Sequence, residues 1–121
     1  MMRKRALVVD DDEPIRRMLT KIVERLDLDV DEARDGAEAI ERIDADGYSV
    51  ILLDLMMPRV DGFGVLSHME REHPEDVPRT IIATAVPPHE LSKRLDAPVR
   101  SVHAKPFDIE KLMNDIRELM A

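Results

Sequence analysis

Apolar and polar residues alternate along this chain in blocks, a pattern that predicts five short strands separated by helices. The apolar runs predict buried strands at Arg5–Val9, Ser49–Leu55, Thr80–Ala85 and Val99–Ala104, with a weaker alternating strand at Asp27–Ala33. Apolar positions at helical spacing lie between and after these runs: Ile15, Met18, Leu19, Ile22, Val23 and Leu26, then Ala37, Ile40 and Ile43, then Val65, Leu66 and Met69, and finally Ile109, Leu112, Met113 and Ile116. Strands that alternate with helices predict an α/β fold in which helices cover both faces of a parallel sheet.

The segment between the last two strands departs from this regular pattern. It reads VPPHELSKRLDA and contains the adjacent prolines Pro87 and Pro88. Proline lacks an amide hydrogen and clashes with the preceding turn, so it disfavours helix interiors. We therefore expect the fourth helix, near His89–Leu95, to be short or irregular.

Composition limits the class of protein. The 121 residues suffice for one domain spanning residues 1–121, and the formal charge of 18 − 26 = −8 argues against direct nucleic-acid binding. The chain has no cysteine, which excludes disulfides and is compatible with a cytoplasmic location. No apolar run approaches the roughly 20 residues of a membrane span, and the apolar stretch near the N-terminus is too short for a signal peptide.

Four of the predicted strands end at residues suited to phosphate chemistry. These residues are Asp10, Asp11 and Asp12 after the first strand, Asp54 after the third, Thr84 at the end of the fourth and Lys105 after the fifth. The carboxyl ends of parallel strands form the edge at which open α/β sheets bind ligands. Carboxylates crowded at that edge repel one another, and a divalent cation such as Mg²⁺ relieves the repulsion.

These strand endings, in this order, resemble the receiver domain of two-component response regulators. The resemblance rests on the acidic pair after the first strand, LLDLMMPRVDG after the third, TA after the fourth and KPF after the fifth, and it covers essentially the whole chain. It implies a flavodoxin-like, doubly wound sheet with strand order 2-1-3-4-5.

The resemblance also implies roles for the acidic residues. Asp54 matches the aspartate that accepts a phosphoryl group from a phosphohistidine of a histidine kinase or histidine phosphotransfer protein. Asp11 and Asp54, with the backbone carbonyl of Met56, would bind Mg²⁺ directly, and Asp10 would act through a bound water. Asp12, the third acid of the run, would then be a loop or cap residue.

Thr84 and Lys105 match the hydroxyl and the ammonium that contact the phosphoryl group in the family. The resemblance further implies a cis peptide before Pro106. Such a domain promotes its own phosphorylation but is not an ordinary enzyme, and its change of conformation would signal to a downstream effector that the sequence does not identify. The family comparison is compatible with a monomer or a weak dimer.

Several positions depart from the family pattern, among them Pro98-Val99, where receivers commonly have Gly-Ala after the fourth helix. Val102 stands where receivers commonly carry an aromatic residue that moves with the switch threonine. Met56 and Val86 are apolar at positions where a polar side chain would orient a hydrolytic water. We therefore expect slow self-dephosphorylation.

Two other functions are compatible with the same residues. A pseudo-receiver would bind partners without being phosphorylated, as the unusual segment from Val86 to Val102 suggests. A phosphatase similar to haloacid dehalogenases would use Asp10 and Asp12 as its Asp-x-Asp motif, with Asp10 as the nucleophile. Loss of phosphate incorporation in Asp54→Asn favours the receiver, whereas loss in Asp10→Asn alone favours the phosphatase.

The four histidines form no metal-ligand pattern in the sequence. His68 and His73 are five residues apart, which is poor spacing for one face of a helix. We interpret these two, together with His89 and His103, as surface residues.

Overall fold

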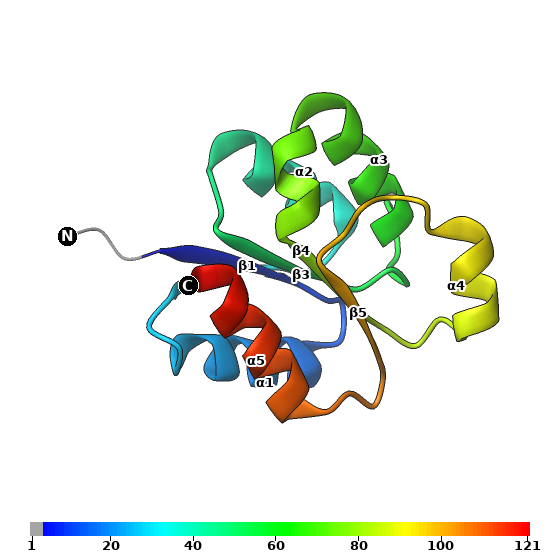
Figure 1. Ribbon diagram of the computed structural model, residues 1–121. Helices are drawn as coiled ribbons and strands as arrows, with labels where there is room; N and C mark the ends of the chain where they lie inside the picture. Colours follow the sequence, from blue (N-terminus) through cyan, green and yellow to red (C-terminus); the bar gives the residue numbers. More distant parts are fainter. Residues whose placement is uncertain (1–3) are drawn as a thin grey trace.

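The computed structural model describes residues 4–121 as a five-stranded parallel sheet with helices on both faces (Figure 1). The strands are β1 (Arg5–Val9), β2 (Asp29–Ala33), β3 (Val50–Leu53), β4 (Thr80–Thr84) and β5 (Ser101–Ala104). The helices are α1 (Glu13–Glu24), α2 (Gly36–Ala45), α3 (Gly62–Glu72), the 3₁₀ helix η1 (Pro74–Arg79), α4 (Pro88–Arg94) and α5 (Ile109–Met120). The strand order β2-β1-β3-β4-β5 confirms the doubly wound topology expected from the sequence.

The central strand β3 is buried along its whole length. It pairs with β1 and β4, and its last residue, Leu53, lies beside Val9 of β1 and Ile82 of β4. Helices exclude water from both faces of a parallel sheet, so a central strand reads as a continuous apolar run instead of an alternating one. This register sets the ends of β1 and β3 next to each other.

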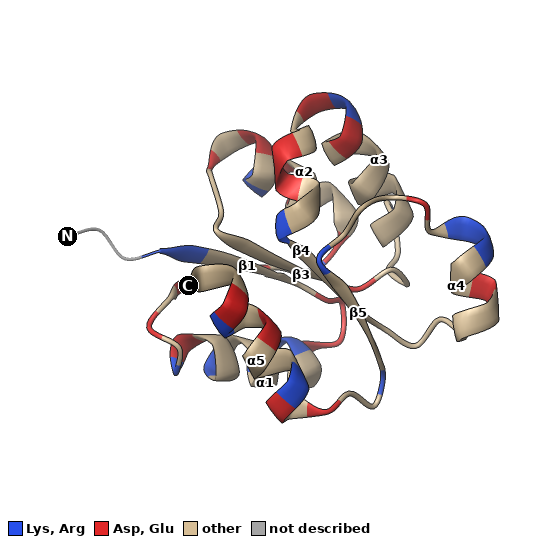
Figure 2. Cartoon of the chain, viewed as in Figure 1, with Lys and Arg blue, Asp and Glu red and all other residues tan. Residues whose placement is uncertain are grey.

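Two apolar layers hold the helices against the sheet. On one face, Ile51 and Leu53 pack with residues of α2, α3 and α4, such as Ile43, Val65 and Leu91. The other layer lies on the opposite face, and its members include Val8 and Leu52 of the sheet, Leu19 and Val23 of α1, and Leu112 and Ile116 of α5. Figure 2 shows that charged residues lie mainly on the helices and in loops, including those after β1 and β3.

Aspartates begin every α-helix except α4. The carboxylates of Asp12, Asp35, Asp61 and Asp108 accept hydrogen bonds from backbone amides in the first turns of α1, α2, α3 and α5. Such caps satisfy amides that have no partner within the helix and each stabilise it by about 1 kcal/mol. The expected role of Asp12 as a cap residue is therefore confirmed.

The segment from α4 to β5 is the least regular part of the sheet's surroundings. Helix α4 has seven residues and starts after Pro87 without a side-chain cap, which confirms the expected short helix. Residues of β5 are alternately half-buried and exposed, and Val102 is 41% exposed. This edge of the sheet is thus open to solvent where the family commonly places an aromatic ring.

Two details of the fold differ from the sequence-based expectation. Met18 and Ile109, expected to face the core, are exposed and line a groove between α1 and the segment that begins α5. The helix η1 was not anticipated, because a 3₁₀ turn is too short to show helical periodicity in the sequence. Within residues 4–121, no helix is long and apolar enough to cross a membrane.

Candidate functional site

Asp10 and Asp54 lie next to each other at the carboxyl edge of the sheet. The amide of Asp54 donates to the carbonyl of Val9 at 3.0 Å, which continues the pairing of β3 with β1 by one residue. Both residues are buried: Asp10 is 1% exposed and Asp54 is 5% exposed. The strand register therefore brings together two acids that are 44 positions apart in the sequence.

Lys105 binds both of these carboxylates. Its Nζ donates to Oδ2 of Asp10 at 2.7 Å and to Oδ2 of Asp54 at 3.4 Å. The amide of Lys105 donates to the carbonyl of Thr84 at 2.8 Å, and the peptide before Pro106 is cis, as expected. Lys105 thus bridges the two carboxylates, and its shorter contact is with Asp10.

The remaining carboxylate oxygens accept hydrogen bonds from the backbone two residues further along the chain. Oδ1 of Asp10 accepts from the amide of Asp12 at 2.9 Å, and Oδ1 of Asp54 accepts from the amide of Met56 at 3.1 Å. These local bonds fix each carboxylate on the turn that follows its strand. The second oxygen of each faces the ammonium of Lys105.

Burial and pairing shift the pKa values of this cluster. Burial raises the pKa of the Asp10 carboxyl, and the hydrogen bonds from Lys105 and from the Asp12 amide only partly offset that rise. Burial alone would lower the pKa of Lys105, but its bonds and charge attraction to Asp10 and Asp54 outweigh burial and raise it. Lys105 therefore remains a cation at neutral pH.

Asp11 completes an oxygen-only cluster with Asp10 and Asp54. One carboxylate oxygen from each residue lies within 4.8 Å of the other two, and Asp11 is exposed while the others are buried. An all-oxygen set that is open to solvent on one side suits Mg²⁺, which retains several of its waters when it binds protein. The residues present therefore fit the metal that the sequence suggested.

Thr84 lies at the end of β4 and is fully buried. Its hydroxyl oxygen accepts from the amide of Val86 at 3.3 Å, which leaves the hydroxyl hydrogen available for a different acceptor. This hydrogen bond links the Thr84 hydroxyl to the start of the β4–α4 loop.

A pocket of about 450 Å³ opens beside this cluster, and apolar side chains line most of it. Asp11, Met56, Val86 and Arg94 all contribute to its wall. Gly62 keeps the loop after β3 close to the strand, because a Cβ atom there would lie 2.4 Å from the carbonyl oxygen of Asp54. The apolar side chains of Met56 and Val86 therefore line the same pocket as Asp11.

The interpretation of the histidines needs correction for three of the four. His68 and His73 are half-buried and both bind the carboxylate of Asp44, at 2.7 and 2.8 Å. Helix α3 ends at Glu72 and His73 is its non-helical C-cap, so the spacing rule for a continuous helix does not apply to this pair. His103 is half-buried as well, and its Nε2 contacts Oδ2 of Asp115 at 2.7 Å.

Comparison with known proteins identifies the class of domain to which this arrangement belongs. The family model described as the response regulator receiver domain matches residues 6–117. Response regulator MprA of Mycobacterium ulcerans (strain Agy99) is 35% identical over 119 residues, and that of Mycobacterium tuberculosis (strain ATCC 25177 / H37Ra) is 34% identical. Both alignments include 98% of this chain and 51% of the relative, so the chain spans about half the length of these curated relatives.

Solved structures agree with this match. The receiver domain of the Francisella response regulator 1452 superposes with a TM-score of 0.85 at 29% identity, covering 96% of this chain and 95% of that one. Response regulator TrrA from Thermotoga maritima, solved in complex with Mg²⁺-BeF, gives 0.85 at 27% identity, covering 96% and 98%. Fold, family match and curated relatives agree, and the chain belongs to the family of response regulator receiver domains.

Proposed function

We propose that Asp54 is the phosphoacceptor of this receiver and that a phosphohistidine is the donor. The observation that carries the proposal is the position of Asp54, a buried carboxylate at the end of β3 within reach of the Lys105 ammonium. A carboxylate oxygen attacks the phosphorus atom, the bond from phosphorus to the histidine nitrogen breaks, and an acyl phosphate forms on Asp54. The donor histidine leaves with its electron pair and takes up a proton.

Asp10, Asp11 and Asp54, with the backbone carbonyl of Met56, would hold Mg²⁺ in this proposal. Support comes from their oxygen-only donor set and from TrrA, which was solved in complex with Mg²⁺-BeF. When bound, the ion supplies positive charge that reduces repulsion between the carboxylates and the incoming phosphoryl oxygens. Asp10 and Asp54 are already oriented by backbone amides, so the protein needs little rearrangement to present them.

Lys105 and Thr84 would then respond to the new phosphoryl group. The ammonium of Lys105 bridges two carboxylates at rest and can move a short distance to pair with a phosphoryl oxygen. The hydroxyl of Thr84 has a hydrogen to donate, and its link to the Val86 amide couples that bond to the β4–α4 loop. This coupling is how phosphorylation would change the surface that a partner recognises.

A histidine kinase or histidine phosphotransfer protein is the proposed donor, and a downstream effector or output domain the proposed recipient of the signal. We place the exchange in the cytoplasm, with which the absence of cysteine is compatible. Residues 1–121 would act as one unit, as a monomer or a weak dimer.

A phosphatase that uses Asp10 as its nucleophile has less support. Asp12, the second acid of its motif, is exposed and accepts the amide of Ile15 as the cap of α1. Asp10 is held by Lys105 and by the Asp12 amide. A pseudo-receiver has less support as well, because the acids, the lysine and the threonine are all present at the sheet edge.

Incubation with acetyl phosphate and Mg²⁺, followed by intact mass measurement, tests the proposal. Wild-type protein should gain the mass of one phosphoryl group, Asp54→Asn should gain none, and Asp10→Asn should gain less at a given time. Circular dichroism of each variant controls for folding. Incorporation that persists in Asp54→Asn and disappears in Asp10→Asn would overturn the assignment.

Loss of the phosphoryl group should be slow. Met56 and Val86 border the pocket beside Asp11, and neither side chain can orient or deprotonate an attacking water. Met56→Asn should accelerate dephosphorylation by roughly tenfold or more, since general-base or positioning groups contribute about 10²–10⁴-fold when ideally placed. The decay of phosphorylated protein in Mg²⁺ measures this, and rapid decay of the wild type would contradict it.

A further inference from the structure

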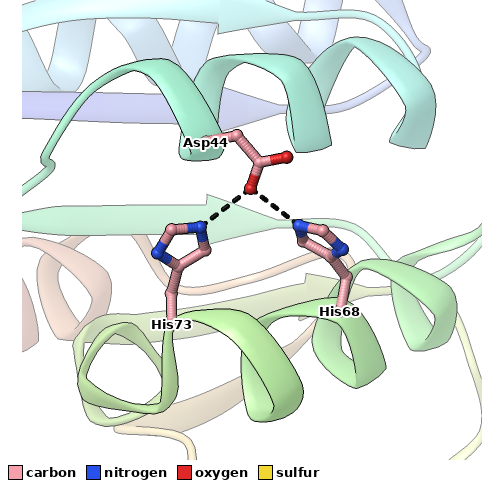
Figure 3. Close-up of side chains that lie close together, drawn as sticks. All are labelled: Asp44, His68 and His73. Atoms are coloured by element: carbon pink, nitrogen blue, oxygen red, sulfur yellow. Dashed lines mark hydrogen bonds and ion pairs between the residues drawn. The ribbon is translucent and has the colours of Figure 1, made fainter.

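Three side chains converge on one point between α2 and α3 (Figure 3). Asp44 comes from the last turns of α2, and His68 from α3. His73 is the C-cap residue that directly follows α3. The Nε2 atoms of both imidazoles contact the same oxygen, Oδ1 of Asp44, at 2.7 and 2.8 Å.

The end of α3 brings the two imidazoles together. His73 leaves the helical conformation, with φ −142° and ψ 59°, while its amide still donates to the carbonyl of Met69 at 2.8 Å. This backbone turn sets its ring 6.0 Å from the ring of His68, between centroids, with the ring planes tilted by 52°. The two imidazoles therefore present one nitrogen each toward Asp44 of α2, although the histidines are five positions apart in the sequence.

We propose that Asp44, His68 and His73 form a binding site for a divalent transition-metal ion, with Zn²⁺ as the best-fitting ion. One potential ligand atom from each residue lies within 4.8 Å of the other two. Two donors bound to a tetrahedral zinc ion at about 2.0–2.2 Å lie roughly 3.4 Å apart. Small rotations of these partly exposed side chains would replace the two hydrogen bonds with bonds to the ion.

The donor set selects the class of ion. Two imidazole nitrogens and one carboxylate oxygen suit zinc, copper or nickel, whereas Mg²⁺ prefers oxygen alone. The side chains of His68 and His73 are 18% and 27% exposed, and that of Asp44 is 47% exposed. Solvent therefore reaches the cluster and can supply water as the fourth ligand, as in zinc sites with three protein ligands.

A further carboxylate lies behind His73. Oε1 of Glu75 is 3.9 Å from Nδ1 of His73, on the side of the ring away from Asp44. Metal-binding imidazoles usually direct their second nitrogen at a carboxylate, a carbonyl or water, which fixes the ring and strengthens the ligand. A small rotation of Glu75 would complete that contact.

The site is distinct from the acidic cluster proposed for Mg²⁺. Asp44 lies near the end of α2, just before β3 begins, and His73 lies just before η1 leads into β4. In a parallel sheet these positions are at the amino edge, whereas Asp54 lies at the carboxyl edge. A metal at Asp44 would join α2 to α3 across the end of the molecule opposite the phosphoacceptor.

Isothermal titration of ZnCl₂ into the protein, with excess Mg²⁺ to occupy the acidic cluster, tests this proposal. Wild-type protein should bind one equivalent of zinc, and His68→Gln and His73→Gln should each weaken binding at least tenfold. His89→Gln is the matched control, since His89 is exposed on α4, and it should bind zinc like the wild type. Asp54→Asn should also retain the site.

Histidine NMR signals in the unmodified protein provide an independent readout that does not depend on a variant folding. Zinc should shift the imidazole resonances of His68 and His73 and leave those of His89 and His103 in place. Zinc affinity that is unchanged in His68→Gln and His73→Gln, or lost in Asp54→Asn, would show that the ion binds elsewhere. Absence of zinc binding in the wild type would show a hydrogen-bonded helix contact only, and would overturn the proposal.

Discussion

The two sides of the sheet differ in regularity: the side around β1 and β3 is more regular than the side around α4 and β5. Around β1 and β3, both of these strands are almost wholly buried, α1, α2 and α3 begin with aspartate caps, and the carboxylates of Asp10 and Asp54 accept hydrogen bonds from backbone amides. On the β4–β5 side, α4 has seven residues and no side-chain cap, and Val102 is exposed on β5. The carboxylates proposed for phosphoryl transfer are thus fixed in position. The α4–β5 surface, which a partner would recognise, has fewer stabilising contacts.

Rigidity is needed at the carboxylates more than at the surface that a partner would recognise. Phosphoryl transfer requires acids held in position, and burial with local hydrogen bonds provides this at little cost in conformational change. A surface that changes conformation on phosphorylation is expected to lie in a region of low local stability, because such a region rearranges at a small cost in free energy. Thr84 lies where the buried sheet meets the β4–α4 loop, because it is buried at the end of β4 and its hydroxyl oxygen accepts a hydrogen bond from the amide of Val86.

The largest expected contrast between the two sides is in core stability. Ile51 of β3 is fully buried, so Ile51→Ala should lower the free energy of unfolding by about 2–5 kcal/mol. Val102→Ala on β5 should lower it by less than about 1 kcal/mol, because the side chain is already 41% exposed. Urea unfolding measures both, and similar losses in the two variants would remove the distinction between the sides.

A smaller effect is expected where α4 meets α3. The guanidinium of Arg94 lies over the ring of Phe63, 3.8 Å from its centroid. Arg94→Ala should lower the free energy of unfolding by about 0.5–1 kcal/mol, the usual range for an exposed cation–π contact. The same change should speed hydrogen exchange of the α4 amides. Lys93→Ala, an exposed change on the same helix, is the matched control. Equal exchange rates in both variants would show that Arg94 does not fasten α4.

The smallest expected effect concerns α5 and depends on pH. Burial would raise the pKa of Asp115, but hydrogen bonds from Ser101 and His103 outweigh it and lower the pKa below its usual value. A lowered carboxyl pKa in the folded state stabilises the protein above the unfolded-state pKa near 4, and this stabilisation disappears as pH falls through the folded-state pKa.

Asp115→Asn should therefore lower the free energy of unfolding by about 0.5 kcal/mol at pH 7, because Asp115 is partly exposed, and by less as the pH falls toward 3. Guanidinium unfolding at the two pH values measures the difference between variant and wild type. Asp96→Asn, an exposed aspartate in the loop before β5, provides the control. A loss that does not depend on pH would show that the charge of Asp115 contributes nothing.

Much of this arrangement could be predicted from the sequence. Apolar runs predict four of the strands and a weak alternation predicts the fifth, and the strand endings place Asp10, Asp54 and Lys105 at one edge of the sheet. The pair Pro87 and Pro88 predicted the short α4. These features depend on local pattern and on topology, both of which are visible in a linear chain.

The rest depends on three-dimensional detail that the pattern does not contain. The closer pairing of Lys105 with Asp10 is set by side-chain placement at the sheet edge. The convergence of His68 and His73 on Asp44 depends on where α3 ends and on its approach to α2. Spacing along an ideal helix could not reveal that contact, because His73 is not helical.

The central claim, that Asp54 accepts the phosphoryl group, is tested most directly by locating the modification. After incubation with acetyl phosphate and Mg²⁺, borohydride reduces an aspartyl phosphate to homoserine, which peptide mass spectrometry can place in the sequence. We expect homoserine at position 54 and nowhere else. Homoserine at position 10, or unmodified aspartate at position 54 in protein that has gained a phosphoryl group, would contradict the claim.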